Sequence, residues 1–211
     1  MSTVTSLPEE RERAGSAAAD RLEPRALRTR TLILQAVRDA LTEVAIDDLT
    51  VSDLSRRAGV HRVTFYGHWP DVQAAASDAF AEVIDRIATI DERDVATATR
   101  PGELATRYQR ALVAQLVEIR DHRDIYRTLA ESPVFARRLI EALHDRAALA
   151  VSSLVQLGVD VPGAGSGLAT AHIAGGIVAA SLHWARTDDQ DVEEAARQIT
   201  AQLPAWWPQP S

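Results

Sequence analysis

The sequence predicts an all-α fold, and three observations support that prediction. The 211 residues are 46% hydrophobic and 25% charged, which are the proportions of an ordinary globular protein. After Pro24, apolar residues recur three and four positions apart, as they do on one face of a helix. Almost no segment alternates with the period of two that marks a strand. The length suggests one or two domains, at about 150 residues each.

The periodicity predicts about nine helices. In the first, at about Arg25–Ala45, the apolar residues Ile33, Val37 and Leu41 share one face. Thr50 is expected to cap a second, brief helix that Gly59 ends. The other helices are expected over residues 61–69, 71–90, 101–120, 122–131, 133–157, 168–186 and 192–203.

Composition and charge exclude several classes of protein. The chain has no cysteine, which excludes disulfide frameworks, thiolate zinc sites and cysteine nucleophiles. Its net charge of −7 argues against coating nucleic acid by bulk attraction, so any contact with DNA needs a local basic patch. Residues 25–70 hold seven Arg against five acidic residues, a balance of +2, and the segments on either side of them are net negative. A basic patch is therefore expected within residues 25–70.

The most informative segment is TVSDLSRRAGVHRVTFYGHWP, from Thr50 to Pro70. Two short helices joined at Gly59 form a helix-turn-helix, whose second helix can enter the DNA major groove. Within that helix the guanidinium of Arg62 suits guanine O6 and N7 or a phosphate, and the hydroxyl and methyl of Thr64 suit base edges. His61 can form a hydrogen bond at the exposed N-terminal end. Tyr66 and His68 are placed to reach phosphates. Three residues are expected to pack inward, namely Val60, Phe65 and Trp69.

From about Arg25 to Phe80 the chain resembles the DNA-binding domain of TetR-type bacterial transcriptional regulators. The matching positions are Thr50, Leu54, Ala58, Gly59, Val60, Thr64, Phe65, Tyr66, His68, Trp69 and Pro70. The resemblance implies a homodimeric repressor that binds a palindromic double-stranded DNA operator and is released by a small-molecule effector. It also implies that Ser52, Arg62 and Thr64 face bases, and that Thr50, Tyr66 and His68 face phosphates. One departure from the family pattern is Val72, where the family commonly has a phosphate-binding lysine.

Three segments are therefore expected along the chain. Residues 1–24 read as a disordered arm, which is either an inert tail or an arm that touches the DNA minor groove. Residues 25–70 form the DNA-binding domain, and residues 71–211 form the ligand-binding and dimerisation domain. No signal peptide is visible, and no later run approaches the ~18 apolar residues of a spanning helix. The protein is expected to be cytoplasmic, with no membrane partner.

A stripe of small residues marks the expected helix at 168–186. Glycine in a helix interior costs about 1 kcal/mol relative to alanine, so a close helix contact should compensate for two adjacent glycines. The favoured interpretation is a dimer interface built from this helix and the next, and the alternative is packing within one chain. The residues expected there are Ala171, Gly175, Gly176, Ala179, Ala180 and Ile199.

An effector pocket is expected among the helices between residues 101 and 186, which carry aromatic and aliphatic residues with a few polar tips. Each of the candidates could instead be an ordinary core residue. They are Tyr108, Tyr126, Phe135, Leu139, Leu143, His172 and Trp184. The sequence contains no metal-ligand motif, phosphate loop or distinguished acid–base pair, so no cofactor, metal or enzymatic activity is expected. The predicted function is a ligand-responsive DNA-binding regulator; the rivals are a helical protein that sequesters a small molecule without binding an operator, and an all-α enzyme.

Overall fold

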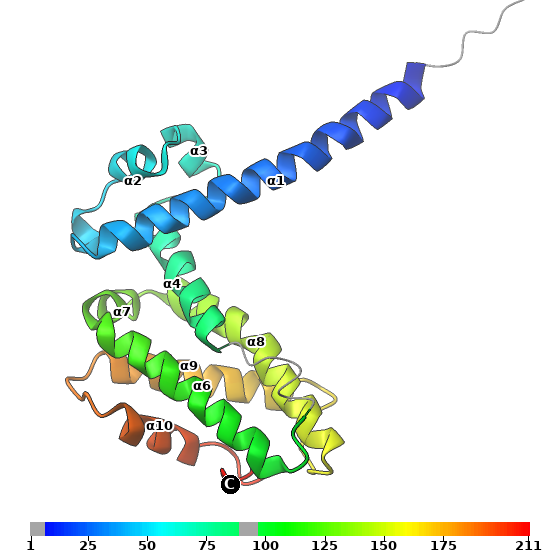
Figure 1. Cartoon of the computed structure of the whole chain (residues 1–211), viewed down its shortest axis with the longest axis vertical. Helices are drawn as coiled ribbons and strands as arrows, with labels where there is room; N and C mark the ends of the chain where they lie inside the picture. The colour runs from blue at the N-terminus through cyan, green and yellow to red at the C-terminus, as the bar shows by residue number, and fades with distance from the viewer. Residues whose placement is uncertain (1–6, 89–96) are drawn as a thin grey trace, which may run out of the picture. The chain divides into compact units, whose positions relative to one another are not determined.

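The structure is a computed structural model that describes residues 7–88 and 97–211, with side chains described from Pro24 onward (Figure 1). The described residues form nine α-helices and one short 3-10 helix, and they contain no strand. The predicted all-α fold is therefore confirmed. The chain divides into two compact units between Ala75 and Ala76, a few residues beyond the boundary expected after Pro70. Helix α4 (Val72–Ala88) begins in the first unit and continues into the second.

The first helix is longer than the sequence predicts. Helix α1 spans Leu7–Leu41 and includes Pro24, whereas the sequence analysis assigned a disordered arm to residues 1–24 and began the helix at Arg25. The structure has helix over residues 7–24, and residues 1–6 lie outside the described part of the chain. The segment before Pro24 is rich in Ala, Glu and Arg, which are strong helix formers. Their propensity outweighs the hydrogen bond that the proline cannot donate.

Helices α2 (Val51–Ala58) and α3 (Arg62–Tyr66) form the predicted helix-turn-helix, which follows a short 3-10 turn at Ile46–Asp48. Thr50 caps α2, since its hydroxyl oxygen accepts a hydrogen bond from the backbone N–H of Asp53 at 3.1 Å. Gly59 ends α2 in the left-handed region with φ 66°. The N–H of Val60 then donates to the carbonyl of Ser55 at 2.9 Å, which closes the turn.

The core of the first unit holds α3 against α1. Phe65 and Leu54 are fully buried and Trp69 nearly so, together with Ile33 and Val37 of α1. The rings of Phe65 and Trp69 lie 5.9 Å apart between centroids. Helix α3 ends at Tyr66, three residues earlier than predicted, because the N–H groups of His68 and Trp69 both bond to the carbonyl of Phe65 in a turn. The two buried aromatic residues fix which face of α3 points outward.

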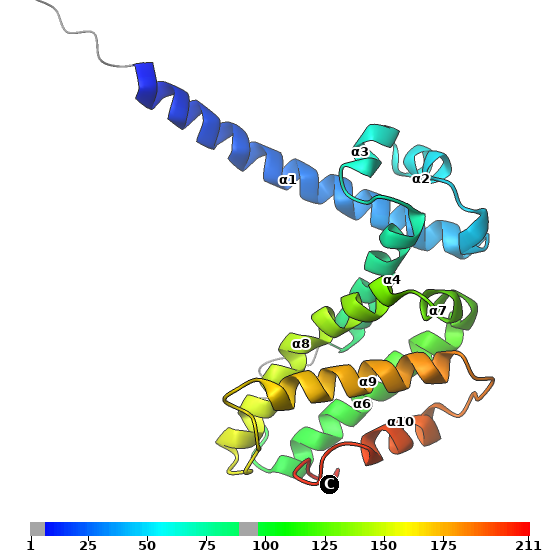
Figure 2. The same ribbon diagram turned by 180° about the vertical axis from the view of Figure 1, so that it is seen from behind.

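The second unit is a bundle around one apolar core. Its further helices are α6 (Pro101–Asp121), α7 (Arg123–Leu129), α8 (Pro133–Gln156), α9 (Leu168–Ala185) and α10 (Val192–Ala201). Helix α8 packs against α9, and α9, α6 and α10 run side by side (Figure 2). The buried core residues between these helices include Leu104, Ala147, Ala150, Leu154, Ile173, Ala174 and Trp207.

Helix α7 holds the loop between α9 and α10 through a buried arginine. Arg123 is only 8% exposed, and its guanidinium donates to three backbone carbonyls, those of Trp184 at 3.1 Å, Thr187 at 2.5 Å and Asp189 at 2.6 Å. The same guanidinium lies 4.3 Å from the centroid of the Trp184 ring, within cation–π range. Burial lowers the pKa of Arg123 from its ordinary value, and the nearby Arg127 lowers it further. The carbonyl oxygens of the loop compensate for burying this charge.

Helix α9 corrects one sequence expectation. Its 18 residues, Leu168–Ala185, are long and apolar enough to cross a membrane by length and composition alone, although no later run was expected to approach that length. Half of the helix is buried inside the protein, where Ile173, Ala174, Val178 and Leu182 are core residues. The apolar character of this face is therefore accounted for by packing in the bundle.

We predict that Gly59→Ala destabilises the protein by about 1 kcal/mol, because an alanine in the left-handed region costs about 1–2 kcal/mol. No atom lies within 4 Å of the added Cβ, so the cost is backbone strain and not a clash. Urea unfolding measures the change, and Gly59→Asn is the matched control, since asparagine adopts this conformation more readily. Equal stability of the alanine variant and the native protein would contradict this account of the turn.

Candidate nucleic-acid interface and effector cavity

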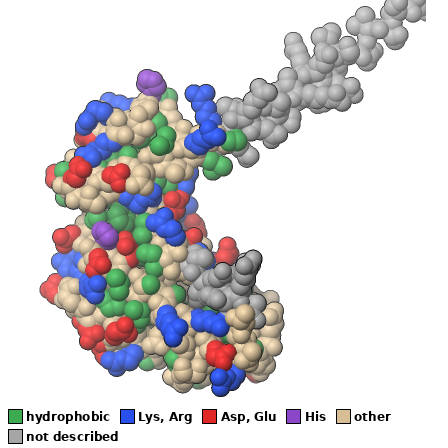
Figure 3. All heavy atoms as spheres, in the orientation of Figure 1, with side chains coloured by type: hydrophobic (Ala, Val, Ile, Leu, Met, Phe, Trp, Pro, Cys, Tyr) green, Lys and Arg blue, Asp and Glu red, His purple; other side chains and the backbone are tan. Residues whose placement is uncertain are grey.

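Six of the seven residues expected to contact DNA are exposed on the first unit. His61, Arg62 and Thr64 are exposed on α3 or at its start. On the same unit Thr50, Ser52 and Tyr66 are exposed, and His68 is half-buried beside Trp69. Phe65 and Trp69 pack inward as predicted, while Val60 is half-buried. The surface over α2 and α3 carries arginine and histidine side chains (Figure 3).

Two carboxylates neutralise the arginines of α2. Arg57 donates to Glu43 at 2.6 Å, and this contact ties α2 to the chain that follows α1. That bond lowers the pKa of the Glu43 carboxyl, and bonds from Thr50 and Arg56 lower the pKa of Asp53 in the same way. Both carboxyls therefore stay anionic at neutral pH. Arg62 has no ion-pair partner among the described residues, so α3 presents its guanidinium to an outside ligand.

Sequence reasoning missed one exposed residue on this surface. Val63 is 83% exposed, the most of the large hydrophobic residues in the described chain. It lies between Arg62 and Thr64 on α3, and a small apolar group there suits the methyl group of a thymine. The signal was present in the sequence, since a residue two positions from the inward-facing Phe65 points to the opposite side of a helix.

The start of α4 lies where the family pattern predicts it. Val72 is the first residue of α4, and the carboxylate of Asp71 accepts a hydrogen bond from the N–H of Ala74 at 2.7 Å. Val72 thus occupies the first turn but supplies no charge for a phosphate.

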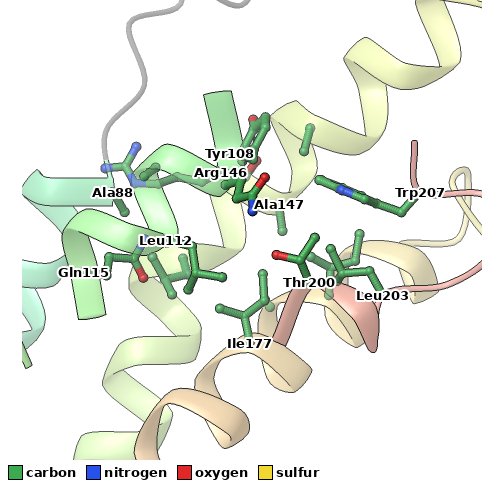
Figure 4. Close-up of a pocket in the computed structure, with 16 residues that line it drawn as sticks. Ala88, Tyr108, Leu112, Gln115, Arg146, Ala147, Ile177, Thr200, Leu203 and Trp207 are labelled. Carbon is green, nitrogen blue, oxygen red and sulfur yellow. The ribbon is translucent and has the colours of Figure 1, made fainter. Parts of the chain in front are cut away.

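The second unit contains a mostly apolar cavity of about 60 Å³ (Figure 4). In the view, Ala88 and Gln115 lie at one end, with Trp207 and Leu203 at the other. Five helices and the C-terminal segment contribute to the walls. The lining residues are Ala88, Tyr108, Gln109, Ala111, Leu112, Gln115, Leu143, Arg146, Ala147, Ala150, Ile173, Ala174, Ile177, Thr200, Leu203 and Trp207.

Two of the seven predicted pocket residues, Tyr108 and Leu143, line this cavity. Tyr126 instead packs against Phe80 and Phe135, and Leu139 is buried outside the lining. Trp184 packs against Arg123, and His172 is exposed on α9. Sequence reasoning did not find Gln115, Arg146, Thr200 or Trp207. Helical periodicity predicts which face turns inward, but it does not predict which side chains of separate helices meet.

The polar groups of the cavity come from α6 and α8. The phenol of Tyr108 donates to the carbonyl of Arg146 at 3.1 Å, and burial raises its pKa well above the ordinary value. Nη2 of Arg146 donates to Asp85 of α4 at 2.7 Å. Nε of Arg146 is buried with no hydrogen-bond partner among the described residues. Gln115 is 7% exposed, and no hydrogen bond of its side chain is found in the described part of the chain.

The small-residue stripe lies on the outward face of α9. Ala171, Gly176 and Ala179 are exposed, and Gly175 and Ala180 are half-buried. A Cβ added at Gly175 or Gly176 meets no atom within 4 Å, so no described part of this chain packs closely over the glycines. Ile199 differs from the others, because it is buried beneath the groove between α9 and α10. Nothing within the described chain accounts for the two glycines.

Known proteins resemble this chain in sequence and in fold. No family model matches the sequence. Uncharacterised HTH-type transcriptional regulators of Mycobacterium bovis and Mycobacterium tuberculosis are 29% identical over 89 residues, which is 42% of this chain and 41% of each relative. The chain thus matches about two fifths of the length of these curated relatives.

Solved structures match over most of the chain. FadR of Thermus thermophilus, a TetR-family repressor solved with lauroyl-CoA, has a TM-score of 0.66 at 19% identity and covers 82% of this chain and 92% of its own. RolR solved with resorcinol has a TM-score of 0.61 at 18% identity, covering 87% and 98%. The repressor AlkX of Dietzia has a TM-score of 0.54 at 17% identity, covering 82% and 91%. The chain therefore has the fold of the TetR-family transcriptional regulators, and the resemblance found in its sequence is confirmed at the level of the fold.

Proposed function

We propose that the chain is a DNA-binding transcriptional regulator that acts as a repressor, binds a palindromic operator as a homodimer and is released by a small molecule. The observation that carries the proposal is the surface of α3. Two buried aromatic residues, Phe65 and Trp69, anchor the helix, and Arg62, Val63 and Thr64 are exposed. A short, rigidly held helix with an unpaired arginine is suited to the major groove.

The residues of this surface divide into two roles. Arg62 offers two parallel N–H donors to O6 and N7 of a guanine, and Thr64 and Ser52 offer hydroxyls to other base edges. Thr50, Tyr66, His61 and His68 flank them and provide donors for phosphate oxygens, which position the protein without reading sequence. This division agrees with a net charge of −7, because binding rests on a local surface and not on the whole molecule.

The effector binds in the cavity of the second unit. Two proteins of similar fold were solved with lauroyl-CoA and with resorcinol, so this architecture holds small molecules of different chemistry. Ligand pockets ordinarily measure about 300–1,000 Å³, and the cavity here, at about 60 Å³, must widen to admit a ligand. Widening displaces the lining helices, including α4 at Ala88.

Helix α4 provides the route from the cavity to DNA. It begins six residues after the end of α3 and continues to the cavity at Ala88, so a shift at its far end is transmitted along one helix. In a dimer, that shift changes the separation of the two DNA-binding units, which must match about 34 Å for half-sites one helical turn apart. A regulator of this kind works in the bacterial cytoplasm and needs no enzymatic activity.

The dimer forms through α9 and α10. The exposed stripe of Ala171, Gly176 and Ala179 allows close approach of the same stripe from a second chain, as an isologous interface requires. Such contact would compensate for the two glycines in the interior of α9. A four-helix bundle from two chains follows from this arrangement.

We predict that Arg62→Ala weakens operator binding by about 1–3 kcal/mol and relaxes the preference at one base pair per half-site. The reason is the loss of a bidentate contact to guanine. Fluorescence anisotropy with duplexes that vary at each position measures both effects. Arg137→Ala is the control, since Arg137 is exposed on α8 of the second unit. An equal loss on all sequences would assign Arg62 to a phosphate.

We predict that Gly175→Leu weakens the dimer by about 1–3 kcal/mol through overpacking at the interface. Leucine is the better helix former, so the folded monomer should not lose stability. Sedimentation equilibrium measures the dissociation constant, and Gly165→Leu is the control, because Gly165 also has open surroundings but lies outside α9. If the dissociation constant of the Gly175 variant equals that of the native protein, the interface lies elsewhere.

A further inference from the structure

We infer that the cavity of the second unit binds a small carboxylate with a compact apolar body, and that Arg146 is the group that pairs with the carboxylate. The inference rests on the proposed function, in which this cavity holds the effector, and it assigns a chemical class to that effector.

The charge of the cavity favours an anion. Among the described residues that line the cavity, Arg146 is the one charged side chain, and none is Asp or Glu. Most of the other walls are aliphatic or aromatic, including Leu112, Ile173 and Trp207. In this apolar setting a positive group interacts strongly with a carboxylate.

Arg146 has hydrogen-bonding capacity left over. Its bond to Asp85 uses Nη2, and Nε is buried without an acceptor in the described part of the chain. A buried donor without an acceptor is costly, and a planar guanidinium can donate two parallel hydrogen bonds to a carboxylate from two of its nitrogens. A ligand carboxylate would satisfy this donor.

The positions of Arg146 and Gln115 fit a ligand whose carboxylate lies at one end of the cavity. Figure 4 shows the guanidinium of Arg146 reaching toward Ala88, at the end of the cavity where Gln115 lies. The amide of Gln115 is a second donor for the carboxylate. The opposite end is formed by Leu203 and Trp207, which suits an apolar body. Because the cavity measures about 60 Å³, one ring or a short chain requires less widening than a long acyl group.

The inferred ligand competes with Asp85 for Arg146. Asp85 lies on α4, one turn before Ala88, and the Arg146–Asp85 pair joins α8 to α4. A carboxylate that takes over the guanidinium weakens this link. Arg146 thereby both binds the ligand and couples ligand binding to α4, the helix that begins beside the DNA-binding surface.

The test compares carboxylates with their uncharged amides of the same shape, using benzoate against benzamide and hexanoate against hexanamide. Binding to the full-length protein is followed by tryptophan fluorescence, because Trp207 lines the cavity, and by calorimetry. We expect at least one carboxylate to bind about 10- to 100-fold more tightly than its amide, as a charge-assisted hydrogen bond implies. No preference for either carboxylate in the native protein overturns the inference, and this comparison needs no variant.

Variants then test the assignment to Arg146. Arg146→Gln should abolish the preference, whereas Arg137→Gln, an exposed arginine of the same helix, should keep it. Asp85→Asn should bind the carboxylate roughly two- to fivefold more tightly, because the competing partner is neutral. A preference that survives Arg146→Gln in a variant with native helical content overturns the assignment. DNA binding measured without ligand distinguishes failure of this inference from failure of the proposed function. Operator binding without a carboxylate preference refutes this inference alone. A carboxylate preference without DNA binding refutes the proposed function alone.

Discussion

The second unit depends on the packing of α9, an 18-residue helix that is apolar over most of its length. One face packs against α8 and the core, with Ile173, Ala174 and Val178 buried. The other face carries small residues, and its two glycines have open space around them. A helix of this composition is stable in water only when its apolar face is covered. On the opposite face the side chains are small, so a partner that packs there must approach the helix closely. Helix α9 therefore contributes to the core, to the cavity wall and to the proposed dimer contact.

Two arginines of this unit, the buried Arg123 and the half-buried Arg146, differ in their surroundings. Arg123 donates to the carbonyls of Trp184, Thr187 and Asp189 and stacks on the Trp184 ring, although its Nε, like that of Arg146, is buried without an acceptor in the described part of the chain. Arg146 has a partner at Nη2, an unsatisfied Nε and a position on a cavity wall. The unpaired Nε alone therefore does not distinguish the two residues. The ligand inference rests on Arg146 because Arg146 lines the cavity and Arg123 does not.

The sequence predicted the local features well because they depend on neighbouring residues. The cap at Thr50, the left-handed turn at Gly59 and the burial of Phe65 all follow from spacing along one short segment. The extension of α1 through Pro24 was not predicted, because residues 1–24 carry few large apolar groups and their composition is typical of an arm. The cavity residues Arg146 and Trp207 were missed for a different reason. They meet only after several helices have packed, and no local pattern distinguishes them from other residues of an amphipathic helix.

Packing also determines the DNA-binding surface, because the burial of Phe65 and Trp69 fixes which side of α3 is exposed. The central claim is that this surface, presented twice by a dimer, reads a specific palindrome. Selection of bound duplexes from a random-sequence pool by the full-length protein tests it most directly. The account predicts enrichment of a two-fold-symmetric site whose half-sites are centred about 10 base pairs, or a multiple of that distance, apart. Recovery of sequences indistinguishable from the starting pool would contradict it.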